Sequence, residues 1–357
     1  MYLKQLKGKR VALITNHSAL VGKEHLVDFL LKNEVDIVKI FGPEHGFRGD
    51  QADGAKINDE VDSKTGIPLI SLYKESKKPS KKVLEGIDIL IFDVQDVGIR
   101  FYTFISTLSY AMEACAENNI AFMVLDRPNP NSFYVDGPVL DPAYTSFIGM
   151  HQVPIVYGMT IGEYALMVKG EKWINQSEAL NLNIVEIGNY THDSIYSLPI
   201  APSPNLPNMK SILLYPSLCY FEGANVSIGR GTDKPFQVMG YPNSPIGTYE
   251  FTPVSIPGVS EYPKFQNQLC KGIDLSYLSE EEIIAQASIH WEYLWQMYRS
   301  LGEEKFFKSL DHFQKLSGSD QLHQALKQGK SIEEYRASYQ DDLNAFKKIR
   351  AKYLLYP

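Results

Sequence analysis

The amino-acid sequence predicts an α/β protein built on a doubly wound, mainly parallel sheet, followed by a second, smaller α+β lobe. In the first 130 residues, short apolar runs alternate with segments of helical periodicity. Such runs are typical of parallel strands buried on both faces, because the crossover helices cover the sheet from each side. From about residue 247 the chain instead mixes short strand-like pieces with helices. We therefore expect a large domain at residues 1–246 and a smaller one at 247–357.

The predicted elements follow from the periodicity of apolar residues along the chain. Near-continuous apolar runs predict strands at residues 11–15, 35–41, 87–93 and 121–125. Helical periodicity predicts helices at residues 23–33, 103–118, 160–169, 280–298, 305–316, 320–328 and 332–352. Thr160 and Glu163 have the spacing of a capping box, in which each side chain binds a backbone N–H at the start of a helix.

Composition and charge are those of an ordinary globular protein. Of the 357 residues 44% are hydrophobic and 22% charged, and the net charge of -7 argues against a nucleic-acid or anionic-membrane partner. Cys115, Cys219 and Cys270 lie far apart in apolar surroundings, so we expect buried thiols and neither a disulfide framework nor a zinc site. No apolar stretch is long enough to cross a membrane, and the first ten residues are too polar for a secretory signal. The residues alone leave the compartment and the oligomeric state open.

Polar side chains follow each of the four predicted strands. Because the carboxyl ends of parallel strands meet at one edge of a sheet, and ligands of open α/β folds bind there, this edge is the expected site. The side chains at these positions are Asn16, His17, Glu44, His45, Arg48, Asp93, Gln95, Asp96, Asp126, Arg127 and Asn129.

The most distinctive of these segments is GPEHG at residues 42–46. Pro43 restricts the backbone and the flanking glycines permit tight turns, so Glu44 and His45 are expected on a constrained loop at a strand end. This placement favours a functional role for Glu44. His45 either takes part in the chemistry or only orients its neighbour.

The aspartates have structural explanations as well. Asp126 precedes a Pro-Asn-Pro turn and is either a cap or turn former or a member of the site. Asp93 and Asp96 stand at the end of a buried strand, where an unpaired carboxylate is costly, so Arg100 and Arg48 are expected as their partners. Structural ion pairing and substrate binding both stay open for these residues.

A glycine-flanked arginine stands in the segment GRGT at residues 229–232. The segment lacks the spacing of a nucleotide phosphate loop, and Arg230 is better suited to bind a ligand carboxylate through two parallel hydrogen bonds. Glu222, just upstream, is a second candidate acid or base. No GxGxxG follows the first strand, so no dinucleotide cofactor is expected, and a metal is not favoured because no metal-binding histidine spacing occurs.

The segment FGPEHGFRG at residues 41–49 resembles the NamZ-type exo-β-N-acetylmuramidases, glycoside hydrolase family 171. Further segments resemble the same family in order along the chain, at residues 8–16, 93–102, 125–130, 137–141, 158–163, 203–207 and 222–232. The resemblance implies a Rossmann-like large lobe, a smaller C-terminal lobe, and a cleft between them for a terminal β-1,4-linked N-acetylmuramic acid residue. It also implies Glu44 as the catalytic glutamate, no cofactor, and a periplasmic or secreted location.

Hydrolysis of a glycoside needs an acid that protonates the leaving oxygen and a second group that stabilises or traps the sugar cation. Glu44 is the expected acid, and the second group is either a carboxylate or the acetamido group of the substrate itself. The candidate carboxylates are Asp93, Asp96, Asp126 and Glu222. The candidate catalytic residues are Glu44, His45, Asp93 and Glu222. The candidate substrate-binding residues, all of which lie in the matching segments, are Asn16, Arg48, Asp96, Arg100, Asp126, Asn205, Asn225 and Arg230.

N-acetylmuramic acid carries a lactyl carboxylate, so an arginine is expected in the site, with Arg230 first and then Arg48 and Arg100. The expected partners are peptidoglycan-derived fragments in which N-acetylmuramic acid is linked to N-acetylglucosamine. Two other classes of protein would use the same cleft. One is a non-catalytic receptor for cell-wall sugars, and the other is a metal-dependent hydrolase that uses the histidines and aspartates at the strand ends.

Overall fold

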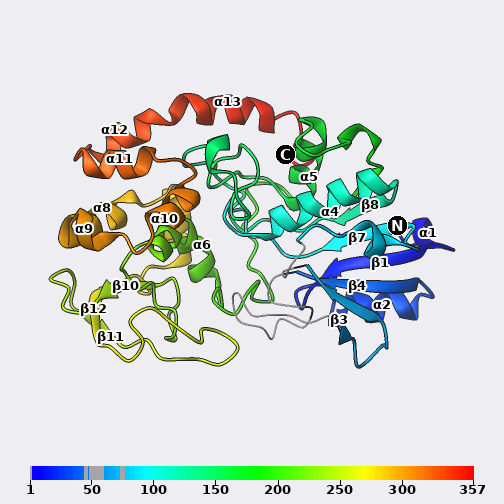
Figure 1. The fold of residues 1–357 in the computed structure, drawn as a ribbon, viewed down its shortest axis with the longest axis horizontal. Coiled ribbons are helices and arrows are strands. Elements are labelled where there is room, and N and C mark those ends of the chain that lie inside the picture. Colours follow the sequence, from blue (N-terminus) through cyan, green and yellow to red (C-terminus); the bar gives the residue numbers. More distant parts are fainter. Residues whose placement is uncertain (1, 44–46, 48–59, 73–76) are drawn as a thin grey trace.

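The protein has two lobes that lie side by side, a larger one that carries the N-terminus and a smaller one formed by later parts of the chain (Figure 1). The structure is a computed structural model that describes residues 2–43, 47, 60–72 and 77–357. Both lobes combine sheets with helices, so the predicted fold class is confirmed.

The large lobe is built on a seven-stranded sheet. Its strands, in spatial order, are β5 (Glu60–Val61), β6 (Pro68–Ser71), β4 (Asp36–Gly42), β1 (Arg10–Thr15), β7 (Ile89–Asp93), β8 (Ala121–Leu125) and β9 (Leu182–Val185). Neighbouring strands are parallel except for the antiparallel pair of β5 and β6. The chain adds strands on one side of β1, returns to β7, and then adds strands on the other side, which is the order of a Rossmann fold. The order therefore reverses between β1 and β7.

Side chains of the central strands alternate between two apolar clusters, one on each face of the sheet. Leu13 and Ile91 share one cluster with residues of α2 (Leu26–Lys32). Ile14 and Phe92 belong to the other cluster, which contains residues of α4 (Phe104–Asn118). Because successive side chains of a strand point to opposite faces, burial on both faces makes each strand a continuous apolar run, as the sequence analysis assumed.

The four predicted strands are confirmed, and β6 and β9 are strands that the sequence analysis did not predict. Both are four residues long, and their side chains are less completely buried than those of the central strands. The capping box at the start of α5 (Ile161–Gly170) is confirmed, because the Thr160 hydroxyl accepts from the Glu163 backbone and the Glu163 carboxylate accepts from the Thr160 backbone.

Three of the helices predicted in the C-terminal part are each divided in two. The pairs are α7 (Glu280–Gln286) with α8 (Trp291–Leu301), α9 (Glu303–Phe306) with α10 (Leu310–Ser317), and α12 (Ile332–Ser338) with α13 (Gln340–Arg350). Ala287 ends α7 in a left-handed backbone conformation with φ of 42°, so the helix cannot continue there. The remaining elements are α1 (Leu3–Leu6), β2 (Leu20–Val21), β3 (Glu24–His25), α3 (Lys81–Leu84), η1 (Pro142–Tyr144), η2 (Ser177–Ala179), α6 (Met209–Leu218), η3 (Cys219–Gly223) and α11 (Gln321–Lys327).

The small lobe contains a three-stranded antiparallel sheet. Its strands, in spatial order, are β10 (Val238–Tyr241), β12 (Cys270–Asp274) and β11 (Tyr249–Phe251). Gly240 and Gly272 stand opposite each other in this sheet, and a Cβ on Gly272 would lie only 1.9 Å from the Met239 carbonyl oxygen. β10 lies before residue 247 and pairs with β12, which lies after that residue. The predicted domain boundary after residue 246 stays a prediction.

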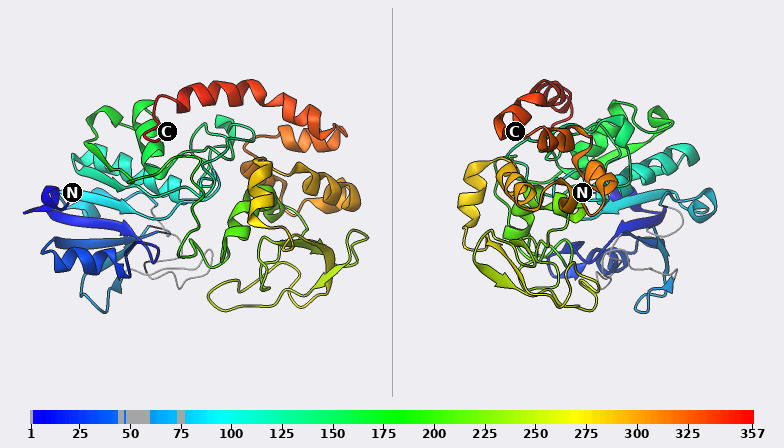
Figure 2. Two further views of the ribbon diagram at one scale, coloured as in Figure 1. Left: turned by 180° about the vertical axis from the view of Figure 1, so that it is seen from behind. Right: turned by 60° about the vertical axis from the view of Figure 1, so that its left-hand side comes forward.

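The helices α12 and α13 run across both lobes, as Figure 1 and the left view of Figure 2 show. Arg336 of α12 pairs with Asp136 at 3.3 Å, and Arg350 of α13 donates to the Gly158 carbonyl at 2.9 Å. The largest apolar cluster contains residues of the parallel sheet and of the small-lobe helices. The two lobes therefore share one core and are fastened to each other by the end of the chain.

The three cysteines are buried and free, as predicted. Burial raises the pKa of the Cys270 thiol to about 11, so this side chain stays protonated and apolar at neutral pH. Within the described residues, no helix is both long and apolar enough to span a membrane.

Candidate active site

The carboxyl ends of β1 and β7 form the centre of the candidate site. Thr15 of β1 pairs with Asp93 of β7, so Asn16 and Asp93 emerge together at the point where the strand order reverses. Ligands of open α/β sheets bind at such a point. Asn16 accepts hydrogen bonds from the Ser18 backbone N at 3.1 Å and the Ser18 hydroxyl at 2.6 Å, and these bonds close the turn that follows β1.

Asp93 is paired with Arg127, which follows β8. The Arg127 guanidinium donates from Nε to Asp93 Oδ1 at 2.5 Å and from Nη2 to Asp93 Oδ2 at 3.1 Å. Only 3% of the Asp93 side chain is exposed, so this two-point pairing compensates a carboxylate that would otherwise be buried without a partner. The expected pairing of Asp93 with Arg100 is wrong, because the neighbouring strand supplies the arginine.

Asp96 is buried one turn beyond β7. Its Oδ2 accepts hydrogen bonds from the Tyr157 hydroxyl and from the Gly98 backbone N, the latter at 2.7 Å. Burial raises the pKa of Asp96 to about 6, although these hydrogen bonds oppose the shift. The carboxylate thus orders the loop after β7, and its partner is a tyrosine rather than the arginine expected from the sequence.

Asp126 holds the start of α5 and the end of the chain. It accepts hydrogen bonds from the Thr160 hydroxyl, the Gly162 backbone N and the Tyr356 hydroxyl, each at 2.7 Å. Burial raises the pKa of Asp126 to about 6. The geometry supports the structural alternative for this residue, because its carboxylate is used to join β8, α5 and the C-terminal segment.

Arg100 is fully buried between the lobes. Its Nη1 donates to the carbonyls of Pro138 at 2.7 Å and Val153 at 3.0 Å, and its Nη2 donates to those of Leu316 at 3.0 Å and Ser317 at 2.8 Å. The side chain has 0% exposure, so a sugar carboxylate cannot reach it in this arrangement. Arg100 therefore has a structural role rather than the predicted contact with substrate. It belongs to the large lobe and binds the carbonyls at the C-terminal end of α10 in the small lobe.

Glu222 and Arg230 are brought together in the small lobe. Arg230 donates from Nη2 and Nε to Glu222 Oε1, at 2.5 and 3.1 Å, and its guanidinium lies 5.1 Å from the centre of the Phe236 ring. Exposure of 27% for Glu222 and 24% for Arg230 leaves both groups within reach of solvent. The sequence analysis treated them as separate candidates, whereas the structure makes them one charge pair.

The other two candidate asparagines hold backbone segments in place. Asn205 Nδ2 donates to the Val259 carbonyl at 2.8 Å, which ties a loop of the large lobe to a loop of the small lobe. Asn225 Nδ2 donates to the Lys305 carbonyl at 2.8 Å, and its backbone N donates to the Phe306 carbonyl at 2.7 Å. Asn205 therefore lies at the junction of the lobes, and Asn225 anchors α9.

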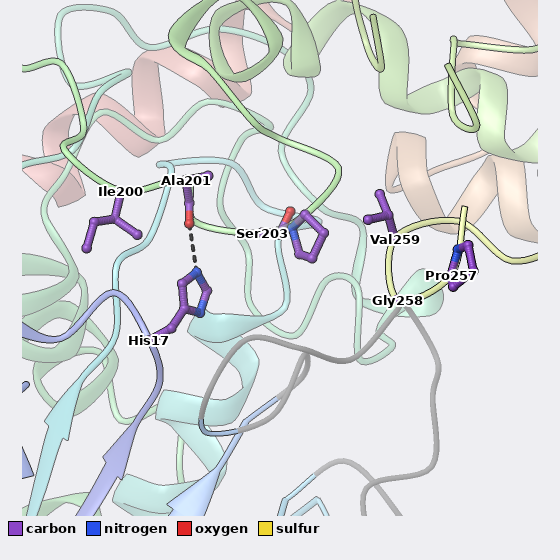
Figure 3. A pocket seen from close by; sticks show the side chains of 8 residues that line it. His17, Ile200, Ala201, Ser203, Pro257, Gly258 and Val259 are labelled. Atoms are coloured by element: carbon purple, nitrogen blue, oxygen red, sulfur yellow. Dashed lines mark hydrogen bonds between the residues drawn. The ribbon is translucent and has the colours of Figure 1, made fainter. Parts of the chain in front are cut away.

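A pocket of about 430 Å³ lies at this junction (Figure 3). The turn after β1 and two loops line it with His17, Ile200, Ala201, Ser203, Pro204, Pro257, Gly258 and Val259. His17 points from the sheet edge toward the loop at residues 200–204, where its Nε2 lies 2.8 Å from the Ala201 carbonyl oxygen. The volume is in the range of small-molecule sites. Most of these residues were not among the candidates. Residues 198–245 are rich in proline and glycine, and loops of this length in compact domains are often functional, which was a signal in the sequence for the loop at residues 200–204.

Glu44, His45 and Arg48 lie outside the described residues, and their predicted roles stay predictions. β4 ends at Gly42, and because β4 is parallel to β1 the chain leaves it at the same edge of the sheet as Asn16. In the ranges that the structure describes, no cluster of three or more His, Cys, Asp or Glu side chains is arranged to hold a metal ion.

Two family models match the chain in succession. The model of the N-terminal part of the exo-β-N-acetylmuramidase NamZ matches residues 11–210, and the model of its C-terminal part matches residues 213–356. The chain belongs to the NamZ family. The membership that the sequence segments implied is thereby confirmed, and the matches extend over both lobes.

Relatives of the NamZ family extend the likeness to nearly the full length. The peptidoglycan β-N-acetylmuramidase NamZ of Bacillus subtilis (strain 168) is 39% identical over 372 residues, which cover 99% of this chain and 89% of that protein. Two crystal structures of DUF1343 family proteins from Bacteroides fragilis NCTC 9343 are similar, with TM-scores of 0.91 and 0.81 at 48% and 30% identity. Each alignment covers 99% of this chain and 96% of the other. The NamZ fold of this chain is therefore matched by crystal structures.

Proposed function

We propose that this protein is an exo-acting β-N-acetylmuramidase, a glycoside hydrolase that removes terminal β-1,4-linked N-acetylmuramic acid from the non-reducing ends of peptidoglycan fragments. The observation that carries the proposal is the ordered match of both NamZ models over residues 11–356. The Bacillus subtilis relative, which is named as a peptidoglycan β-N-acetylmuramidase, supports it. The substrates would be fragments in which N-acetylmuramic acid precedes N-acetylglucosamine, and the enzyme would act on them outside the cytoplasm.

The pocket at the junction of the lobes suits a single sugar at the end of a glycan. It lies at the switch point of the parallel sheet, and both lobes contribute to its wall. The backbone N of Val254 donates to the Gly231 carbonyl at 2.8 Å, which connects the Arg230 loop with the loop that carries the pocket residues 257–259. Arg230 would then bind the lactyl carboxylate that distinguishes muramic acid from glucosamine.

In the proposed reaction, Glu44 donates a proton to the glycosidic oxygen as the bond to the anomeric carbon breaks. A second group must stabilise or trap the sugar cation. Asp93 and Asp96 are buried, and the Asp126 carboxylate is used by three groups of the fold. Glu222 is paired with Arg230 but is 27% exposed, so it is the reachable carboxylate among the described candidates. The second group is therefore either Glu222 or the acetamido group of the substrate.

The experiment that tests the proposal measures chromophore release from 4-nitrophenyl β-N-acetylmuramide, in chelator, by the intact protein and by Glu44→Gln. We expect turnover by the intact protein and its collapse in the variant. Retained binding of muramic fragments without turnover would instead indicate a receptor for cell-wall sugars. Loss of turnover on chelation, with recovery when metal is added back, would indicate a metal-dependent hydrolase.

A further inference from the structure

Lys264 places a partly buried ammonium group at the C-terminal end of η3, the segment that carries Glu222. Its Nζ donates to the carbonyl oxygen of Phe221 at 2.6 Å, to that of Ala224, and at 3.4 Å to that of Glu222. The last carbonyls of a helix have no partner within the helix and concentrate negative potential, so a cation bound there is stabilising. Lys264 therefore holds the backbone that presents the Glu222 carboxylate.

Lys264 belongs to the same loop as the pocket residues 257–259. Asn205 attaches this loop to the large lobe through the Val259 carbonyl, and the Val254 backbone N attaches it to the Arg230 loop. The two loops approach so closely that a Cβ on Gly231 would lie 2.5 Å from the Val254 carbonyl oxygen. Lys264 adds the attachment between this loop and η3, so one side chain joins the pocket wall to the charge pair.

The charges around Lys264 favour an anionic ligand. Two cations, Lys264 and Arg230, both interact with the carboxylate of Glu222. Lys308 adds a further positive charge, and the buried Cys219 thiol also interacts with Lys264. A field of this sign attracts a carboxylate to the Arg230 guanidinium.

We propose that Lys264 is a positioning residue that keeps residues 257–259 and the Glu222–Arg230 pair in one arrangement, and thereby sets the affinity for a carboxylate-bearing sugar. This inference rests on the proposed function. Lys264 contacts backbone carbonyls rather than the reacting bond, so its removal raises KM for a muramic substrate more than it lowers kcat. The source of the effect is the attachment that Lys264 makes, and not only its charge.

The test compares Lys264→Met with Lys308→Met, using 4-nitrophenyl β-N-acetylmuramide. The two substitutions remove the same charge from the same neighbourhood, but Lys308 is exposed and its backbone, not its side chain, makes the recorded bond to Gly223. We expect KM to rise about tenfold for Lys264→Met, as for the loss of a cation at a helix end. Lys308→Met should stay within about twofold. Equal changes in the two variants, or a loss confined to kcat in Lys264→Met, would overturn the proposal.

If Lys264→Met fails to fold, a second measurement tests the positioning role of Lys264. Burial lowers the pKa of Lys264 to about 8, with the positive charges of Lys308 and Arg230 in the same direction and Glu222 opposing. KM of the unmodified protein is therefore expected to rise between pH 7 and 9, and Lys264→Arg, which stays charged, should abolish this rise. An alkaline rise that persists in Lys264→Arg overturns the inference. Absence of turnover by the unmodified protein at every pH would reject the proposed function itself.

Discussion

Substitution of Arg100 by lysine should destabilise the whole molecule rather than only its active site. The guanidinium makes four hydrogen bonds, two to carbonyls of the large lobe and two to the end of α10. A lysine carries one nitrogen and cannot span both pairs, so about two of the four bonds are lost. A hydrogen bond to a charged group contributes roughly 1.5–3 kcal/mol, so the expected loss is about 3 kcal/mol or more. This is a large fraction of the stability of roughly 5–15 kcal/mol that is typical of folded proteins.

Urea denaturation followed by circular dichroism measures this loss as a change in the midpoint. The matched control is Arg10→Lys, because Arg10 is an exposed arginine whose ion pair with Asp88 lies at the surface. We expect the control to unfold at the midpoint of the unmodified protein. A loss below about 1 kcal/mol for Arg100→Lys would refute the reasoning, because it would mean that the buried carbonyls do not depend on the guanidinium.

Two further predictions concern charge. Arg230→Ala should impair turnover of a muramic substrate by about tenfold or more, because the ligand carboxylate loses its hydrogen-bond donor. The substitution should affect turnover of an N-acetylglucosaminide analogue less, since that sugar lacks the carboxylate. An equal loss on both substrates would contradict the role of Arg230 in binding the carboxylate. Burial raises the pKa of Asp96 and Asp126 to about 6, so between about pH 4 and 6 the folded protein keeps protons that the unfolded chain has released. The free energy of unfolding should therefore fall as pH rises through this window, by roughly 1–3 kcal/mol for each group. Asp96→Asn should remove its share of this dependence in urea titrations at several pH values, and an unchanged slope would show that Asp96 does not titrate there.

Local patterns predicted the elements of the fold correctly where one interaction dominates. The central strands are buried on both faces, so their apolar runs stand out from the rest of the sequence. The capping box of Thr160 and Glu163 was predictable because both partners lie within four residues. β9 was missed because its four residues are only partly buried and have no clear apolar pattern.

The candidate site was predictable to the level of the sheet edge, and not to the level of each contact. Parallel strands place Asn16 and Asp93 at one edge of the sheet independently of the contacts that their side chains make, so this edge can be predicted from the strand pattern. The partner of Asp93 does not follow, because Arg127 is 34 positions away and Arg100 is nearer along the chain. His17 and the pocket loops come together only when the two lobes pack.

By itself, the sequence determined the fold class, the family and the edge of the sheet at which the candidate site lies. These properties depend on periodicity and on motifs that are short and contiguous, and each can be recognised without knowing what else is nearby. The tertiary structure alone decided which charges compensate one another and which polar groups stay within reach of a ligand. Arg100 is the clearest case, because its bonds to α10 join residues more than 200 positions apart. Electrostatic and hydrogen-bond energies depend on distance in space and on burial, and a linear sequence specifies neither until the chain has folded.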